Sequence, residues 1–366
     1  SCREQTCRNS SSKINISSHL SRDAFPHFLP AAMGNKPSTS TGEMRGVLRG
    51  GASPIQFYDA GALPAEHYPK MPAAGTDEVL VTVRAAAINP VDYKVNKWIL
   101  GAVMGLDLAG VVAHVPEGST SSLKVGDEVY GTARGSLADR VLARGRSLGI
   151  KPARWSFAQA AAVPTTYVTA LQALRRGGLR KGGDVLVIGA SGGCGTAGLQ
   201  VAKALGCGRL VAVCSGKNAA HCTSHGADAI LDYTRQSILG GYYDVVYDCA
   251  TNSGAGEDYK ADALQVLRPA GARTNESGET AAASHGQYVA INGAVGMWLR
   301  KFTVGQRANE HLFLTDMNTK DLAELSSMAA ALDPVLSMEL PLDEEGVKRG
   351  FDTLKSRRTV GKIVFN

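Results

Sequence analysis

The sequence of 366 residues has no uninterrupted apolar stretch that approaches the roughly 20 residues a helix needs to cross a bilayer. It therefore gives no reason to expect a membrane-spanning segment. It also lacks a strong charge of one sign, because 39 lysines and arginines stand against 33 aspartates and glutamates, a formal net charge of +6. Nucleic-acid-binding proteins usually carry a basic stripe or a strongly basic domain, so this thinly spread excess argues against nucleic acid as a partner.

Cysteine is sparse and is not spaced for a disulfide framework or a closed zinc site. The seven cysteines include no C-x-x-C pair. Five of them lie among apolar or glycine-rich neighbours, and we expect these to be small buried residues in a reducing compartment. The five are Cys194, Cys207, Cys214, Cys222 and Cys249.

Residues 1–43 are rich in Ser, Thr, Asn, Gly and Pro and show neither helical nor strand periodicity, which predicts a disordered tail or a targeting segment. Residues 33–38 read MGNKPS and fit the N-myristoylation pattern M-G-x-x-x-[ST]. If translation starts at Met33, a lipid on Gly34 would give a cytoplasmic protein a weak, reversible peripheral contact with membranes. The alternative is that this Ser-rich, acid-poor leader belongs to a chloroplast or mitochondrial transit peptide.

The body of the chain changes pattern near residue 160. From Met44 to about Val163 it reads as short strands and turns, with strands expected at 78–84 and 110–115 and after the turn at 125–131. Beyond that point strands alternate with helices, and continuous apolar strands separated by helices predict a parallel sheet covered on both faces. The expected fold class is thus α/β, a β-rich domain plus a doubly wound parallel sheet. Strands are expected at 184–190, 210–214, 229–231, 244–249, 288–291 and 312–314, with a helix at 198–206.

The sharpest motif is the glycine-rich turn at 189–195, which reads GASGGCG. It follows a buried apolar strand and precedes an amphipathic helix, the setting in which a helix N-terminus receives a phosphate group. It departs from the strict G-x-G-x-x-G by one inserted residue. We expect this turn to bind the pyrophosphate of a dinucleotide, through Ser191, Gly192, Gly193, Cys194 and Gly195.

The tip of the next strand indicates which dinucleotide is bound. An NAD-binding protein commonly places Asp or Glu there to accept from the ribose 2′-hydroxyl. Here the strand ends CSGKN, with no carboxylate. Because Ser215 can donate to a phosphate and Lys217 can neutralise it, with Asn218 beside them, the turn favours NADPH over NADH.

These motifs stand in a longer series that resembles one family. The series includes AAINPVDYK at 86–94, GLDLAG at 105–110, VGDEV at 125–129, TAL at 169–171, GAD at 226–228 with Asp232-Tyr233, and GKIV at 361–364. From roughly Met44 to Asn366 the chain is similar to the zinc-free quinone oxidoreductases of the medium-chain dehydrogenase/reductase superfamily. Within that group it resembles the chloroplast-envelope quinone oxidoreductases and the alkenal/enone reductases.

The resemblance implies a GroES-like catalytic domain at 44–164 plus 321–366 and an NADPH-binding Rossmann domain at 165–320. The chain returns to the first domain through a helix at 322–332 and a strand at 362–365. It further implies a homodimer that forms through the edge of the Rossmann sheet.

By family position, Asn89 and Tyr93 line the space of the electron acceptor. Thr169 approaches the nicotinamide, and Tyr233 approaches the adenosine-phosphate end. Each has a plainer alternative: Asn89 caps a turn, Tyr93 is a rim aromatic, and Thr169 bonds its own helix backbone. Asp92 and Asp107 are expected to hold loop backbone rather than to act as acid or base.

The resemblance also indicates that no metal is used. Zinc-dependent relatives carry Cys, His-Glu and a second Cys where this chain has Asn89, Leu106-Asp107 and a residue near Pro164. Without a Lewis acid, an unactivated alcohol is hard to polarise. A quinone or an α,β-unsaturated carbonyl, by contrast, already offers an electrophilic carbon to a hydride. The predicted function is zinc-independent, NADPH-dependent reduction of quinones or enones. The alternative is a non-catalytic NADPH-binding or scaffold protein of the same fold.

Overall fold

The computed structural model describes residues 44–49, 55–58, 63–95, 97–251, 258–270, 285–292 and 307–366, with Lys301, Thr303 and Gly305; at 55–58, 97 and 98 it describes the backbone alone. These residues belong to one unit, Pro37–Asn366. The tail predicted at 1–43 lies outside the described residues.

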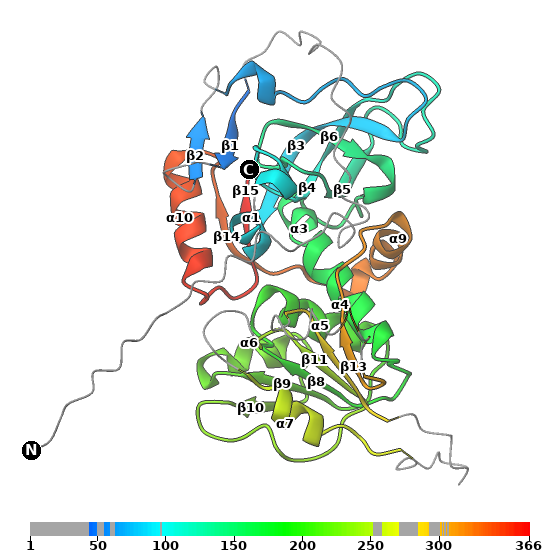
Figure 1. Ribbon diagram of the computed structural model, residues 1–366, viewed down its shortest axis with the longest axis vertical. Helices are drawn as coiled ribbons and strands as arrows, with labels where there is room; N and C mark the ends of the chain where they lie inside the picture. The colour runs from blue at the N-terminus through cyan, green and yellow to red at the C-terminus, as the bar shows by residue number, and fades with distance from the viewer. Residues whose placement is uncertain are drawn as a thin grey trace, which may run out of the picture. The chain divides into compact units, whose positions relative to one another are not determined.

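The β-rich part of the chain forms a seven-stranded sheet (Figure 1). Its strands follow the order β14 (Leu336–Leu340), β15 (Lys362–Phe365), β3 (Glu78–Ile88), β4 (Asp107–His114), β5 (Glu128–Thr132) and β7 (Leu148–Ile150), and β6 (Arg140–Arg144) pairs with β3. Only β14 and β15 pair in parallel. A separate antiparallel pair joins β1 (Gly46–Arg49) to β2 (Ile55–Tyr58). The last strand of the chain therefore lies beside the first long one.

Strand β3 is longer than the predicted 78–84 and contains a β-bulge. Its pairing register with β4 shifts between Val83 and Ala85, and an extra residue in a strand changes which face the following side chains occupy. Val83 consequently packs against two clusters, one with Val79 and one with Ile88. The strands approach closely here, because a methyl group on Gly110 would lie 2.2 Å from the Thr82 carbonyl oxygen.

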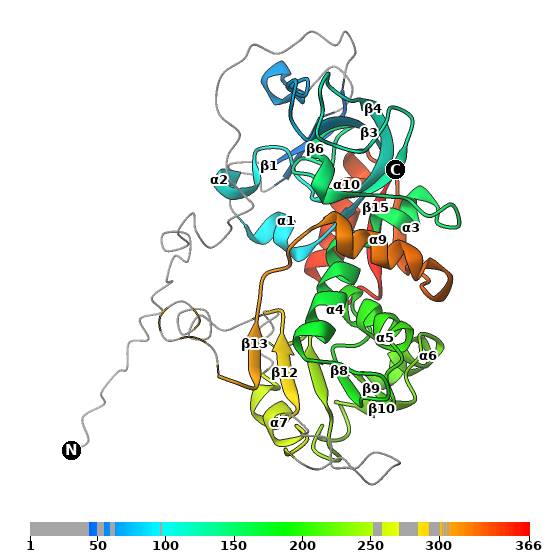
Figure 2. The ribbon, with the colours of Figure 1, turned by 90° about the vertical axis from the view of Figure 1, so that its right-hand side faces the viewer.

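The second sheet has six parallel strands in the order β10 (Ala229–Asp232), β9 (Leu210–Cys214), β8 (Val185–Ile188), β11 (Val245–Asp248), β12 (Gln287–Ala290) and β13 (Glu310–Leu312). In Figure 2, β13 and β10 lie at its two edges. Alternate side chains of β8 enter two different cores, so both faces are buried: Val187 packs with α4 (Pro164–Arg176) and α5 (Gly193–Ala204), whereas Leu186 packs with Ala263 of α7 (Lys260–Gln265). This arrangement confirms the predicted doubly wound parallel sheet.

Helix α4 connects the two sheets. Leu171 and Leu174 lie in the same cluster as Val245 of the parallel sheet and as Ala87 and Tyr130 of the seven-stranded sheet. Pro164 occupies the first turn of this helix, where the missing N–H costs no hydrogen bond. The proline thus begins a helix that is shared by both sheets.

Several predicted elements shift when they are placed in the fold. The helix expected at 198–206 begins at Gly193, because the glycine turn itself forms the first turn of α5. The helix expected at 322–332 is α9 (Thr319–Ser327) followed by a 3-10 turn, Ala329–Ala331. The strand expected at 312–314 lies at β13, two residues earlier. The sequence interpretation missed β14 and α10 (Glu344–Lys355), a helix that begins at an Asp343 cap.

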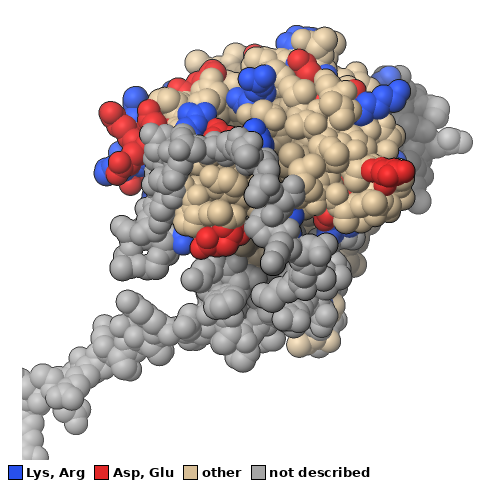
Figure 3. All heavy atoms as spheres, turned by 90° about the horizontal axis from the view of Figure 1, so that it is seen from above, with Lys and Arg blue, Asp and Glu red and all other residues tan. Residues whose placement is uncertain are grey.

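The surface seen in Figure 3 carries lysines and arginines interspersed with acidic residues, and no single-sign patch covers that face. Among the helices of the described ranges, none has the length and apolar character that a bilayer crossing requires.

Candidate active site

The glycine turn presents bare backbone at the N-terminus of α5. Gly192 is the N-cap, and no side chain of the described residues caps it. A methyl group on Gly195 would lie 2.2 Å from the Gly189 carbonyl oxygen, so that position is closed to any side chain, whereas a methyl group on Gly192 would meet nothing nearer than 3.5 Å. Open backbone at an uncapped helix N-terminus fits a dinucleotide pyrophosphate. Cys194 is half-buried at the same turn, and burial raises the pKa of its thiol to about 11.

The turn after β9 packs against the glycine turn. The Asn218 side-chain amide donates to Ser191 Oγ at 2.9 Å, which joins two of the predicted cofactor-binding residues. Ser215 is half-buried, while Lys217 is exposed. These residues therefore lie together at the carboxyl ends of β8 and β9, where open α/β sheets bind ligands.

Asp232, which the sequence interpretation did not place near the coenzyme, lies beside this turn. Asp232 is the last residue of the neighbouring strand β10. Its Oδ2 would lie 2.6 Å from a methyl group on Gly216. The hydroxyl and backbone N–H of Thr234 both donate to Asp232, and these hydrogen bonds lower the pKa of its carboxyl. Parallel pairing of β9 with β10 places this anion next to Lys217's turn. The following residue, Tyr233, is exposed and contacts Tyr259 edge-on at 6.5 Å.

A buried polar cluster lies in the seven-stranded sheet. Asn89, Asp107 and Lys362 are each at most 5% exposed. Lys362 Nζ donates to Asn89 Oδ1 at 2.5 Å, to Asp107 Oδ2 at 3.1 Å and to the Ile88 carbonyl at 3.0 Å. Asn89 Nδ2 donates to Asp107 Oδ2 at 2.9 Å. Asp107 Oδ1 accepts from the backbone N–H and hydroxyl of Thr165, so this carboxylate binds the first turn of helix α4 rather than the backbone of a loop.

Backbone contacts join this cluster to the glycine turn. Gly361, directly before Lys362, forms a parallel β-bridge with Gly192. A methyl group on Gly193 would lie 3.3 Å from both the Gly361 carbonyl oxygen and Lys362 Cδ. The predicted pyrophosphate turn therefore contacts Gly361, and the predicted acceptor-site residue Asn89 contacts Lys362, the next residue along the chain.

Asp92, three residues after Asn89, is fully buried in α1 (Pro90–Lys94). Its Oδ2 accepts from the Asn89 backbone N–H at 2.7 Å, and its Oδ1 has no hydrogen-bond partner among the described residues. Burial raises the pKa of Asp92 to about 7; the Asn89 N–H opposes that rise, the Asp107 charge adds to it, and Lys362 and Arg49 oppose it. Arg49 also donates to the Asp92 carbonyl oxygen.

Tyr93 and Thr169 occupy different surroundings from Asn89. Tyr93 is half-buried against the core under α10, with Lys355 Nζ 6.0 Å from its ring centre. The Thr169 hydroxyl bonds the Thr165 carbonyl of its own helix and lies 2.6 Å from Thr315 Oγ1. The helix-backbone bond proposed as the plainer alternative for Thr169 is thus present.

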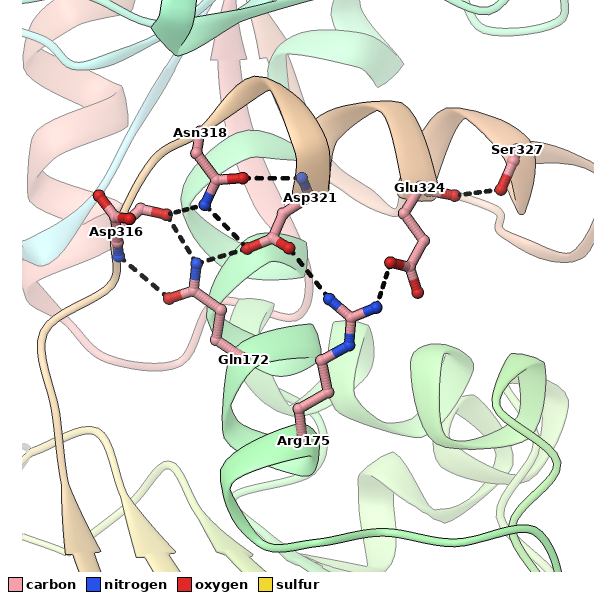
Figure 4. Close-up of polar contacts among 7 residues, drawn as sticks. All are labelled: Gln172, Arg175, Asp316, Asn318, Asp321, Glu324 and Ser327. Carbon is pink, nitrogen blue, oxygen red and sulfur yellow. Dashed lines mark hydrogen bonds and ion pairs between the residues drawn. The ribbon is translucent and has the colours of Figure 1, made fainter.

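Helices α4 and α9 are held together by a polar network (Figure 4). The Gln172 amide donates to the Asp316 carbonyl and to Asp321 Oδ2, both at 2.6 Å, and its oxygen accepts from the Asp316 N–H at 3.0 Å. Arg175 pairs with Asp321 at 3.0 Å and also with Glu324. The segment from Thr315 to Asp321 is therefore fixed along the helix that carries Thr169.

The side chains at Asn89 and Asp107 do not fit a zinc ion. Zinc takes thiolate, imidazole or carboxylate ligands, whereas both of these side chains are hydrogen-bonded to the Lys362 ammonium. Within the described ranges, no group of three or more His, Cys, Asp or Glu residues could hold a metal ion.

The fold is that of a two-sheet α/β protein with an uncapped glycine turn at the N-terminus of α5. Residues 75–173 match the alcohol dehydrogenase GroES-like domain, and residues 225–365 match a family described as zinc-binding dehydrogenase. The chain is 31% identical over 318 residues to 2-methylene-furan-3-one reductase of Solanum lycopersicum, covering 81% of this chain and 73% of that protein. It is 36% identical over 198 residues to the chloroplastic NADPH-dependent alkenal/one oxidoreductase of Arabidopsis thaliana, covering 49% of this chain and 51% of that protein.

A solved structure, the quinone oxidoreductase from Coxiella burnetii, has the same fold with a TM-score of 0.67 at 22% identity, covering 88% of this chain and 98% of that one. The chain belongs to the medium-chain dehydrogenase/reductase superfamily. It is an oxidoreductase that uses a nicotinamide cofactor.

The first prediction concerns the buried Asp92. Between about pH 4 and pH 7 the folded protein keeps a proton on Asp92 that the unfolded chain releases. The free energy of unfolding should therefore fall as the pH rises through this range, by at most about 1.4 kcal/mol per pH unit from this group. The side chain introduced by Asp92→Asn cannot titrate. The urea-unfolding midpoint of this variant should therefore rise relative to that of the wild type from pH 4 to pH 7, and the difference should stay constant above pH 7. Parallel curves over the whole range would contradict the assignment.

The second prediction concerns the network between α4 and α9. Gln172→Leu keeps the side-chain size but removes three hydrogen bonds at a buried position, which should lower the free energy of unfolding by about 1–3 kcal/mol. Gln265→Leu on α7 is the matched control, because Gln265 is exposed and, among the described residues, its side chain bonds only the Ala261 carbonyl of its own helix. Urea unfolding measures both, and equal effects would show that the network adds no stability.

Proposed function

We propose that the chain reduces quinones or α,β-unsaturated carbonyls by hydride transfer from NADPH. One observation carries the proposal: the uncapped glycine turn contacts Gly361 by a β-bridge, and the buried Asn89 amide bonds Lys362, the next residue. A cofactor held at the turn and an acceptor held at Asn89 would thus share one rigid support. The names of the relatives, an alkenal/one oxidoreductase and a 2-methylene-furan-3-one reductase, support the same reaction class.

A bound reduced nicotinamide supplies the hydride. In an enone the hydride goes to the β-carbon, negative charge develops on the carbonyl oxygen, and a proton from water completes the reduction at the α-carbon. A fixed N–H donor near that oxygen stabilises the charge. We assign this role to Asn89 and place Tyr93 at the rim of the acceptor site. Thr169 is proposed to pack beside the nicotinamide rather than to donate a hydrogen bond, because its hydroxyl already bonds Thr165 and Thr315.

At the other end, the pyrophosphate is assigned to residues 191–195 and the adenosine end to Ser215, Lys217, Asn218 and Tyr233. The exposed Lys217 would neutralise the 2′-phosphate of NADPH. Asp232 is the observation that favours NADH, because an ionised carboxylate at the tip of β10 repels a phosphate and can accept from ribose hydroxyls. We propose NADPH as the preferred coenzyme, with Asp232 reducing the preference.

The third prediction tests this balance of charges. Lys217→Glu should raise the KM for NADPH far more than the KM for NADH. Asp232→Asn should act in the opposite direction, lowering the KM for NADPH and raising that for NADH, because it removes the nearby negative charge and an acceptor. Steady-state kinetics with both coenzymes measure the two variants. If each variant changes both KM values by the same factor, these residues do not select the coenzyme.

The fourth prediction separates the enzyme from a non-catalytic NADPH-binding protein. Mixing the protein with NADPH and a panel of quinones and short alkenals should produce acceptor-dependent oxidation, seen as loss of absorbance at the nicotinamide band. A change of NADPH fluorescence without oxidation by any acceptor would favour the binding protein.

Tyr93→Phe should lower enone turnover while leaving NADPH binding nearly intact, and unchanged turnover would remove Tyr93 from the site.

Assembly, domain limits and location remain proposals. We propose a homodimer that forms through edge strand β13, which among the described strands pairs only with β12. The proposed domains are residues 44–164 with 321–366, and residues 165–320.

Relatives named chloroplastic and mitochondrial support an organelle as the location, whereas the MGNKPS pattern supports a cytoplasmic protein with peripheral membrane contact. Intact-mass analysis of the natural N-terminus distinguishes the two.

A further inference from the structure

Lys362 is a buried cation whose hydrogen bonds are all directed inward. An ammonium group has three N–H donors, and the Lys362 Nζ has three acceptors, the Ile88 carbonyl oxygen, Asn89 Oδ1 and Asp107 Oδ2. Its side chain is only 6% exposed, and that of Asp107 is 0% exposed. Lys362 therefore has no N–H left to donate to a substrate. Any effect on the reaction has to pass through the groups that it bonds.

Lys362 fixes the orientation of the Asn89 side-chain amide. An amide can be rotated by 180° with little change in shape, and its partners decide which end is the oxygen. Here a cation donates to Oδ1 and a carboxylate accepts from Nδ2, at 2.5 Å and 2.9 Å. Both contacts would become repulsive if the amide rotated. One hydrogen of Nδ2 is used by Asp107, and the second has no acceptor among the described residues.

We propose that Lys362 is a positioning residue for the reduction: it fixes the Asn89 amide so that the second Nδ2–H faces the acceptor's carbonyl oxygen. The positive charge of the Lys362 ammonium beside Asn89 Oδ1 also polarises the amide and strengthens Nδ2–H as a donor. This inference rests on the proposed function. It assigns the last strand of the chain a role in the chemistry that the predicted motifs did not include.

The experiment is a double-mutant cycle between Lys362 and Asn89. Lys362→Met keeps an unbranched side chain one atom shorter but removes the charge and all three hydrogen bonds, and it should lower kcat by about 10- to 100-fold while the Kd of NADPH stays unchanged. In the background of Asn89→Ala, the same substitution should lower kcat no further, because Lys362 acts through Asn89. An equal loss of kcat in both backgrounds would overturn the proposal.

A matched control comes from a second buried lysine. Lys151 is 5% exposed at its side chain and bonds the Trp155 carbonyl and Glu128, and none of its contacts among the described residues involves Asn89 or Asp107. Lys151→Met should lower stability and leave kcat unchanged. If Lys362→Met alone does not fold, because it leaves Asp107 as a buried unpaired charge, the cycle is run with Lys362→Met/Asp107→Asn, which removes both charges together.

A second readout does not depend on turnover. The Asn89 side-chain amide signal of ¹⁵N-labelled protein is assigned by its loss in Asn89→Ala. In the wild type this signal should exchange slowly with solvent, and in Lys362→Met it should exchange faster and shift. An unchanged signal in folded Lys362→Met overturns the proposal. If the wild type oxidises NADPH in the presence of none of the tested quinones and alkenals, the proposed function fails, while this signal still decides whether Lys362 fixes Asn89.

Discussion

The hydrogen bonds of the Lys362 ammonium are the interaction on which the candidate site depends. An ammonium and a carboxylate are costly to bury unless their charges are paired and their remaining hydrogen-bonding capacity is used. Lys362 and Asp107 meet both conditions, since every N–H of the lysine and both oxygens of the aspartate have partners. This pairing joins the last strand of the chain to β4 and to the turn after β3.

The same strand supports the cofactor side through its backbone. Gly361 contacts Gly192 by a β-bridge, so a displacement of β15 would move both the glycine turn and the Asn89 amide. Helix α4 provides a second connection, since its apolar face packs on both sheets and its first turn binds Asp107 through Thr165. Reduction requires the acceptor and the nicotinamide to be held in one geometry, and these two connections supply a rigid frame for it.

The proposed nucleotide end carries charges of both signs. Lys217 lies on an exposed turn, and Asp232 reaches the same turn from the next strand because β9 and β10 pair in parallel. Exposed charges are screened by solvent, so neither dominates by itself. The proposed preference for NADPH therefore depends on the difference between two nearby opposite charges.

The sequence by itself determined the elements whose signals are local. The apolar strand before the glycine turn, the alternation that predicts a parallel sheet, and the final strand at 362–365 all follow from residues close together in the chain. Helix α10 was missed, and the start of α5 was placed five residues late, because helix ends depend on caps and on the surrounding fold. The bulge in β3 gave no signal in a pattern that assumes strict alternation.

Only the tertiary structure decided which polar groups meet. Lys362 is 273 residues from Asn89 and 255 from Asp107, and nothing in the residues around it distinguishes a buried ammonium from an exposed one. Asp232 likewise reaches the coenzyme turn only through strand pairing, and the Thr169 hydroxyl is bonded by Thr315 from a distant segment. Periodicity and motifs report on neighbours along the chain, whereas hydrogen-bond partners are chosen by packing and sheet register, which only the folded chain defines.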